Sequence, residues 1–296
     1  MEMENTHEAK IKFFQQRDFG EKFNVTIDFL KENFKPLFKI LLMIEGPLIA
    51  IASVLSVIQQ QNMMEMMSTV NQNENPFGVM GSLGTSYSLA TLLSLVIMCT
   101  FPAIVIRYVF VYQNKSPETI TIKDILPTLF RDSGMLFAVT LMYGIAIMIG
   151  MFIFIFPGIY FLIGFSLAYP IIFFEDKNAF DGMSRSLTLI RDNWWSTCGF
   201  LFVLYIIQMA ISMLFMAPQI GVYFKQMLTT FEAADTFEPM STTDMLINML
   251  VTAVGTLGAY LVYTIGTIGI CFQYFNLREQ KESFGLMQQI DNLETE

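Results

Sequence analysis

The sequence predicts an all-α integral membrane protein that crosses the bilayer six times. Hydrophobic residues make up 54% of the 296 residues and charged residues only 15%, whereas about a quarter of a soluble domain is charged. The mean hydropathy is +0.51. The apolar residues gather in six runs long enough to cross ~30 Å of hydrocarbon at ~1.5 Å per residue, and amphipathic stretches that suit a cytoplasmic interface precede several of them.

Composition divides the chain into three parts. Residues 1–18 are polar and irregular, which predicts a solvated cytoplasmic tail. Residues 19–275 hold the apolar runs and form a six-helix membrane domain, and residues 276–296 form a cytoplasmic carboxyl-terminal tail with a short amphipathic helix. We therefore expect a single membrane domain with polar ends.

The six runs differ in how they are separated. They cover residues 37–58, 87–112, 134–155, 159–174, 194–216 and 245–275. Before the first run, residues 19–34 carry an apolar stripe that predicts a helix lying at the membrane interface. Polar loops are expected over residues 59–86 and 217–244, and a second amphipathic connector over residues 177–193.

The third and fourth runs meet at Pro157-Gly158, which leaves no room for a loop. This joint predicts a tight helical hairpin or, alternatively, a re-entrant pair that turns back inside the bilayer. The fourth run is short, and Pro170 lies within it. Because proline removes one helical hydrogen bond, we expect a kink at Pro170.

The basic residues predict the orientation. Of the 17 Lys and Arg residues, only Lys225 falls in a segment that six crossings place outside. Lys and Arg concentrate in the cytoplasmic segments of membrane proteins. Both termini are therefore predicted to be cytoplasmic, and the expected location is the inner membrane of a bacterium.

Three short segments indicate an internal repeat. Residues 29–34, 129–134 and 189–194 share an order of apolar, basic, acidic and small residues where an amphipathic stretch leads into a span. This favours three units of surface helix, span, outer turn and span; the alternative is convergence of helices at one interface. Basic and aromatic residues near these junctions are expected to anchor helix ends or to form a lipid-headgroup site. They are Lys31, Arg131, Lys177, Arg185, Arg191, Trp194 and Trp195.

Two ionisable residues, Glu45 and Arg107, lie inside predicted spans, where a charge is costly and usually paired or functional. Counted from the cytoplasmic ends of their runs, they lie roughly 12 and 8 Å deep at ~1.5 Å per residue. We predict an ion pair between them that fixes the packing of the first two helices. The alternative is a role in a polar cavity or substrate path.

The residue types argue against enzymatic chemistry. His7 is the only histidine and lies in the polar tail, which excludes a histidine-based triad and a histidine metal cluster inside the membrane. The three cysteines lie in apolar runs without partners at metal-ligand spacing, and no basic tract suits nucleic acid. No catalytic residue, cofactor, metal or nucleic-acid partner is expected.

The region of residues 150–200 resembles a known family. Residues 157–160, 166–170, Glu175 and 186–195 are similar to the six-helix membrane-domain family named after the membrane part of glycerophosphoryl diester phosphodiesterase, and to related uncharacterised bacterial membrane proteins. The resemblance implies a proline–glycine turn, a span ending in Pro and an acid, and a cytoplasmic helix before an aromatic-led span. In that family the phosphodiesterase activity belongs to a separate soluble domain, so the resemblance gives no ground for expecting an enzyme here.

These observations predict a non-enzymatic inner-membrane protein that acts as a scaffold or as a subunit of an envelope-associated complex. The expected partners are membrane lipids and a protein at the cytoplasmic face, where the connectors offer an amphipathic surface. The sequence leaves the oligomeric state open. The competing function is a transporter or lipid-handling protein with a polar path near Glu45, Arg107 and Gln273, which repeats and Pro-interrupted spans favour.

Overall fold

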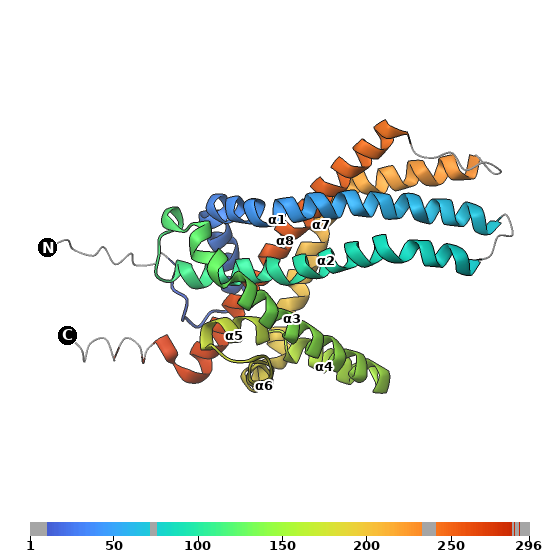
Figure 1. Cartoon of the computed structure of the whole chain (residues 1–296). Helices are drawn as coiled ribbons and strands as arrows, with labels where there is room; N and C mark the ends of the chain where they lie inside the picture. Colours follow the sequence, from blue (N-terminus) through green and yellow to red (C-terminus); the bar gives the residue numbers. More distant parts are fainter. Residues whose placement is uncertain (1–10, 72–75, 233–240, 286, 288–289, 291–296) are drawn as a thin grey trace. The chain divides into compact units, whose positions relative to one another are not determined.

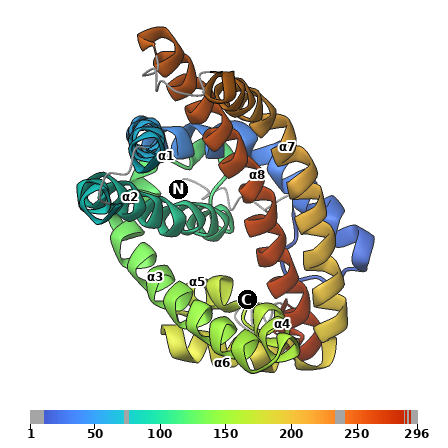
Figure 2. The same cartoon turned by 90° about the vertical axis from the view of Figure 1, so that its right-hand side faces the viewer.

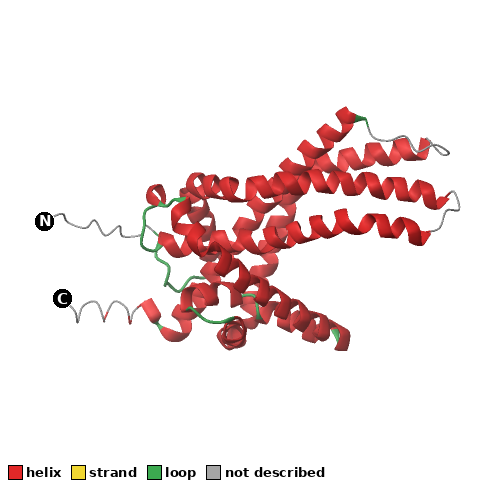
Figure 3. Cartoon of the chain, in the orientation of Figure 1, coloured by secondary structure: helices red, strands yellow, loops and turns green. Residues whose placement is uncertain are grey.

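The computed structural model is all-helical over the residues that it describes (Figure 3). These are residues 11–71, 76–232, 241–285, 287 and 290, with the side chains of 63–71, 76–88, 226 and 229–232 left out. Six of the described helical segments are long and apolar enough to span a membrane. The predicted all-α class and the number of candidate spans are thereby confirmed.

The long helices extend into the expected loops (Figure 1). They are α1 (Phe19–Asn71), α2 (Pro76–Tyr112), α3 (Ile122–Ile153), α7 (Trp194–Glu232) and α8 (Thr242–Glu282). The expected loops over residues 59–86 and 217–244 are therefore largely helical where the structure describes them. Gln and Met, which are frequent in the first of these segments, are good helix formers.

Five short elements complete the described chain. They are η1 (Pro117–Thr119), α4 (Ile155–Gly164), α5 (Ala168–Glu175), α6 (Ala179–Ile190) and η2 (Arg191–Asn193). The side chain of Asn178 caps α6, because its Oδ1 accepts a hydrogen bond from the Asp181 N–H at 2.9 Å. The predicted second connector is thus a separate helix with its own cap.

The chain divides into two compact units. Unit 1 comprises Met1–Ile40, Cys99–Gln208 and Tyr263–Glu296, and unit 2 comprises Leu41–Met98 and Met209–Val262. Every Lys and Arg except Lys225 belongs to the ranges of unit 1. The uneven distribution of basic residues that predicts the membrane orientation therefore coincides with a structural division of the chain.

The start of α1 buries residues outside the predicted apolar stripe. The predicted interfacial helix and the first span are one continuous helix that passes through Pro36. Two residues of the predicted apolar stripe, Phe19 and Phe34, are 44% and 46% exposed. The residues buried instead recur every three or four positions; they are Lys22, Thr26, Phe29 and Asn33. The apolar stripe is therefore partly exposed and partly packed within unit 1, where the Phe23 ring lies 4.7 Å from that of Phe200.

The predicted repeat units differ in their connectors. In the first two, the amphipathic stretch is continuous with the span, in α1 and in α3. In the third, α6 and η2 precede α7 as separate elements. The three-unit repeat stays a prediction.

Residues 11–18 belong to unit 1, and the expected solvated tail is wrong for those of them that pack within it. The Phe13 side chain is 8% exposed and its ring lies 5.9 Å from that of Phe272 and 5.8 Å from that of Tyr112. The Arg17 N–H donates to Asn276 Oδ1 at 2.7 Å. Burial lowers the pKa of the Arg17 guanidinium, and the nearby charge of Glu21 opposes this effect. Burial of an aromatic ring among other rings is a favourable alternative to solvation.

α3 and α4 form a tight hairpin (Figure 1). The turn lies at Phe154, with φ −160° and ψ 151°, three residues before the predicted Pro157-Gly158 joint. Pro157 lies in the first turn of α4, where its missing N–H removes no helical hydrogen bond. A Cβ on Gly150 would lie only 2.8 Å from the Gly158 backbone nitrogen. The hairpin therefore depends on backbone-to-backbone contact between two glycines.

The predicted fourth span consists of two helices. α4 ends at Gly164, and residues 165–167 turn before α5 begins. Pro170 lies in the first turn of α5, so the expected loss of a hydrogen bond within a helix is wrong. The Ser186 Oγ of α6 donates to the Gly164 carbonyl at 2.6 Å and accepts from the Leu167 N–H at 3.2 Å. A side chain of the connector thus satisfies the backbone groups freed by the break.

α7 and α8 run side by side (Figure 2). Within unit 1, a Cβ on Gly266 would lie 2.5 Å from Gln208 Nε2, and within unit 2 a Cβ on Gly258 would lie 2.2 Å from the Phe215 ring. Small residues permit this approach, as in many membrane helix pairs.

Replacing Gly150 by Ala should destabilise the α3–α4 hairpin. The new Cβ has to displace backbone atoms rather than a flexible side chain, so we expect a loss of about 1–3 kcal/mol. Gly144 is a matched control on the same helix, since a Cβ there meets no atom within 4 Å. Gly144→Ala should be neutral or slightly stabilising. Thermal unfolding of both variants in detergent, followed by circular dichroism, checks this; equal melting temperatures would show that the glycine contact is not required.

Candidate functional site

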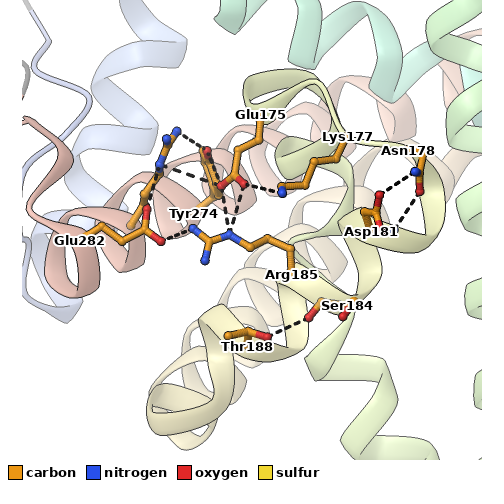
Figure 4. Close-up of polar contacts among 10 residues, drawn as sticks. Glu175, Lys177, Asn178, Asp181, Ser184, Arg185, Thr188, Tyr274 and Glu282 are labelled. Carbon is orange, nitrogen blue, oxygen red and sulfur yellow. Dashed lines mark hydrogen bonds and ion pairs between the residues drawn. The ribbon is translucent and has the colours of Figure 1, made fainter.

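A network of buried and half-buried charges joins α5, α6 and α8 in unit 1 (Figure 4). Its charged members are Glu175, Arg185, Arg278 and Glu282. The side chains of Glu175 and Arg278 are only 9% and 14% exposed. Two acids and two arginines balance one another in this network.

The acids and the arginines alternate around a closed ring. Glu175 Oε2 lies 3.2 Å from Arg185 Nε, and Glu175 Oε1 lies 3.9 Å from Arg278 Nε. Glu282 closes the ring, because one of its oxygens pairs with Arg185 Nη2 and the other lies 3.3 Å from Arg278 Nε. Tyr274 adds a hydroxyl that donates to Glu175 Oε1 at 3.3 Å and accepts from Arg278 Nη1 at 2.8 Å.

Local geometry places these side chains. Tyr274, Arg278 and Glu282 are spaced four residues apart on α8 and therefore share one helix face. Glu175 is the last residue of α5, and the chain leaves that helix through Asp176 in the left-handed region, with φ 47° and ψ 44°. Arg185 projects from α6 toward both (Figure 4). The consecutive helices α5 and α6 thus meet the distant α8 at one point.

Two further basic residues extend the network with more exposed contacts. Lys281 Nζ lies 2.8 Å from Asp192 Oδ2 and donates to the Thr188 carbonyl at 3.1 Å, which ties α8 to the end of α6 and to η2. Lys177 Nζ lies 3.8 Å from Glu175 Oε2, and its side chain is 37% exposed. Exposed pairs of this kind contribute little to stability, because solvent screens them.

Arg107 pairs with an acid that the sequence analysis placed in a loop. Its Nε and Nη2 each donate to an oxygen of Asp132 at 2.8 Å, in a bidentate arrangement. Asp132 is 3% exposed because α3 begins well before it and carries it into unit 1. Glu45 is 1% exposed and belongs to unit 2. The predicted pair of Glu45 with Arg107 stays a prediction, and Asp132 is the partner that the structure gives Arg107.

The other predicted residues have varied surroundings. Lys31 is largely exposed, 3.7 Å from Asp28. Trp194 stacks on Tyr160 with ring centroids 6.2 Å apart, whereas Trp195 is 82% exposed. Arg191 is exposed in η2.

Two polar pairs lie in the apolar interior of unit 1. Gln273 Nε2 donates to Thr197 Oγ1 at 2.9 Å. Tyr108 donates through its hydroxyl to Asn33 Oδ1 at 2.8 Å. All four residues are fully buried.

Sequence reasoning missed Asp132, Tyr274, Arg278 and Glu282 as site residues. Asp132 could have been found, since it lies near the inner end of the third run at a depth similar to that of Arg107 in the second. The four-residue spacing of Tyr274, Arg278 and Glu282, which places them on one face of a helix, was a second signal for the network. It was hidden because the last span was expected to end at residue 275. Among the described residues, no group of three or more His, Cys, Asp or Glu side chains could hold a metal ion.

Replacing Glu175 by Gln should destabilise unit 1. The neutral amide leaves Arg185 and Arg278 with one acid between them in a mostly buried site, so a loss of about 3 kcal/mol is expected. The same substitution at Glu118, which is exposed in η1, should change stability by less than about 0.5 kcal/mol. Chemical unfolding of the purified variants in mixed micelles measures both losses of stability. If the Glu175→Gln protein were as stable as the Glu118→Gln protein, the ion network would not stabilise unit 1.

Comparison with known proteins adds a family assignment. No curated protein and no solved structure matches the chain. A family described as "Domain of unknown function (DUF7847)" matches residues 79–272, about two thirds of the sequence, and this span includes Arg107, Asp132, Glu175 and Arg185. The resemblance to the membrane domain of glycerophosphoryl diester phosphodiesterase stays a prediction. The chain belongs to the DUF7847 family of domains of unknown function.

Proposed function

We propose that this chain is a multi-pass protein of a bacterial inner membrane, and that it acts without enzymatic chemistry as a scaffold or subunit of an envelope-associated complex. The observation that carries the proposal is the closed ion network of Glu175, Arg185, Arg278 and Glu282. It fixes α6 against α5 and α8 and thereby sets the position of the outward face of α6. A fixed amphipathic helix is a suitable surface for a protein partner.

The proposed orientation has both termini in the cytoplasm. Its support is the confinement of Lys and Arg to the ranges of unit 1, with Lys225 as the exception. Because basic residues near the ends of spans favour the cytoplasmic side, unit 1 would carry the inner ends of the helices. The network and α6 would then lie at headgroup depth, within reach of cytoplasmic partners.

The outward face of α6 has the chemistry of a protein contact rather than of a lipid-binding helix. Phe180, Ser184 and Thr188 are spaced four residues apart, and all three are exposed, Phe180 by 70%. Helices that bind membrane surfaces are rich in Lys and Arg on their polar face, whereas this face carries hydroxyls, an aromatic ring and Asp181. An exposed aromatic anchor with hydrogen-bonding neighbours is typical of protein interfaces.

A transporter or lipid-handling protein is the second candidate. The buried pairs Gln273–Thr197 and Tyr108–Asn33 favour it, because polar groups inside membrane helices often line a path. In a scaffold the same pairs would only specify helix packing. The two functions differ in whether α6 has a protein partner.

Photo-crosslinking in native membranes tests the scaffold function. With benzoylphenylalanine in place of Ser184, we expect a discrete protein adduct, and Phe180→Ala in the same chain should reduce its yield at least fivefold. The matched control places the same group at Leu141, an exposed apolar position of α3, and should yield no protein adduct. Absence of any protein adduct from position 184 would contradict the scaffold function and leave the transporter as the better account.

A further inference from the structure

A cavity of about 250 Å³ in unit 1 is bounded by the last turns of α2, by α3 and by the end of α5. One part of its lining is apolar and includes Phe110, Phe173 and Met135. The other part is charged and consists of Arg107, Arg131, Asp132 and Asp176. None of these residues takes part in the ion network of α5, α6 and α8.

Two of the four charges cancel inside the lining. Arg107 and Asp132 bind each other through two hydrogen bonds of 2.8 Å, and their side chains are 12% and 4% exposed. The Arg107 guanidinium also lies over the rings of Phe110 and Phe173, at 5.2 and 5.4 Å from the centroids. This pair therefore forms a neutral, fixed wall of the cavity.

The other two charges are accessible and have opposite signs. Arg131 is 64% exposed, and its Nε lies 3.7 Å from Asp132 Oδ1, a weak contact with an acid that Arg107 already engages. The exposed Asp176 carboxylate forms no hydrogen bond or ion pair with the described residues. An anion alone would leave Asp176 uncompensated, and a cation alone would leave Arg131 uncompensated. The lining thus complements a group that carries one negative and one positive charge.

The size and surroundings of the cavity narrow the choice of ligand. Sites for drug-sized molecules occupy roughly 300–1,000 Å³, so a cavity of about 250 Å³ suits a smaller group. A carboxylate favours an ammonium that can donate hydrogen bonds to it, and a guanidinium favours a phosphate. The apolar part of the lining offers a surface for the first carbons of an attached lipid.

We propose that this cavity binds a zwitterionic phosphate–amine group of the kind found in aminophospholipid headgroups. Arg131 holds the phosphate, Asp176 accepts hydrogen bonds from the ammonium, and the Arg107–Asp132 pair is the neutral wall between them. Asp176 is one of the residues that line the cavity, and its left-handed backbone conformation is compatible with Asn at the same position. This binding site does not depend on the scaffold function. The chain has to lie in a membrane only if the phosphate–amine group that it binds belongs to a lipid.

Native mass spectrometry of the full chain tests the proposal. The protein is purified in detergent doped with equal amounts of phosphatidylethanolamine and phosphatidylglycerol, and the retained lipid is counted. We expect one phosphatidylethanolamine per chain. Arg131→Gln and Asp176→Asn should each reduce its retention about tenfold, the effect of removing one hydrogen bond to a charged group. Lys123→Gln removes a charge from an exposed position of the same helix and should leave retention unchanged.

A selectivity change distinguishes the site from general lipid adhesion. Asp176→Asn leaves Arg131 as the unbalanced charge, so the ratio of phosphatidylglycerol to phosphatidylethanolamine should rise in that variant. Soluble phosphoethanolamine at millimolar concentration serves as the second probe. Displacement of the lipid by it would mean that the site recognises the free group; resistance to displacement would mean that the lipid is the ligand. Equal retention of both lipids by the unaltered chain and by Arg131→Gln and Asp176→Asn would overturn the proposal.

Discussion

The cost of removing charge from water is the constraint on which unit 1 depends. A carboxylate or guanidinium taken into a low-dielectric interior loses several kcal/mol of solvation and recovers it only with partners in good geometry. Glu175, Arg185, Arg278 and Glu282 meet this requirement only when α5, α6 and α8 are assembled. The same demand pairs Arg107 with Asp132. In the observed arrangement of the helices these ionic contacts are satisfied, so a shift of one helix would leave a charge without its partner.

Sequence reasoning succeeded where the signal was local. Long apolar runs predicted six candidate spans, and the amphipathic pattern over residues 177–193 predicted the connector that contains α6. It failed where the outcome depended on distant residues. The break at residues 165–167 relies on one hydrogen bond that Ser186 donates and one that it accepts, and the burial of Phe13 relies on rings of α1, α2 and α8. Helix ends were also misplaced, because a charged or Gln-rich segment can continue a helix beyond the apolar run.

The ion network and the cavity differ in how completely their charges are compensated. In the network every charge meets an opposite charge of the chain itself, which suits a fixed structural element. In the cavity, Arg131 and Asp176 remain available to a ligand beside a pair that is already neutral. A scaffold held at headgroup depth by a bound aminophospholipid is consistent with both arrangements. The lipid would then act as a structural component of the inner surface, next to the helix that faces the protein partner.

In the proposed orientation, the charged end of unit 1 lies at the cytoplasmic surface of the membrane. Ser184, exposed on α6 beside Arg185, reports this directly. In a Ser184→Cys variant, a membrane-impermeant maleimide should react only after the inner membrane is permeabilised. The unaltered chain is the control, because Cys99 and Cys271 are buried and Cys198 is half-buried. Labelling at position 184 from the outside of intact cells would contradict the orientation, and with it the proposed surface for a cytoplasmic partner.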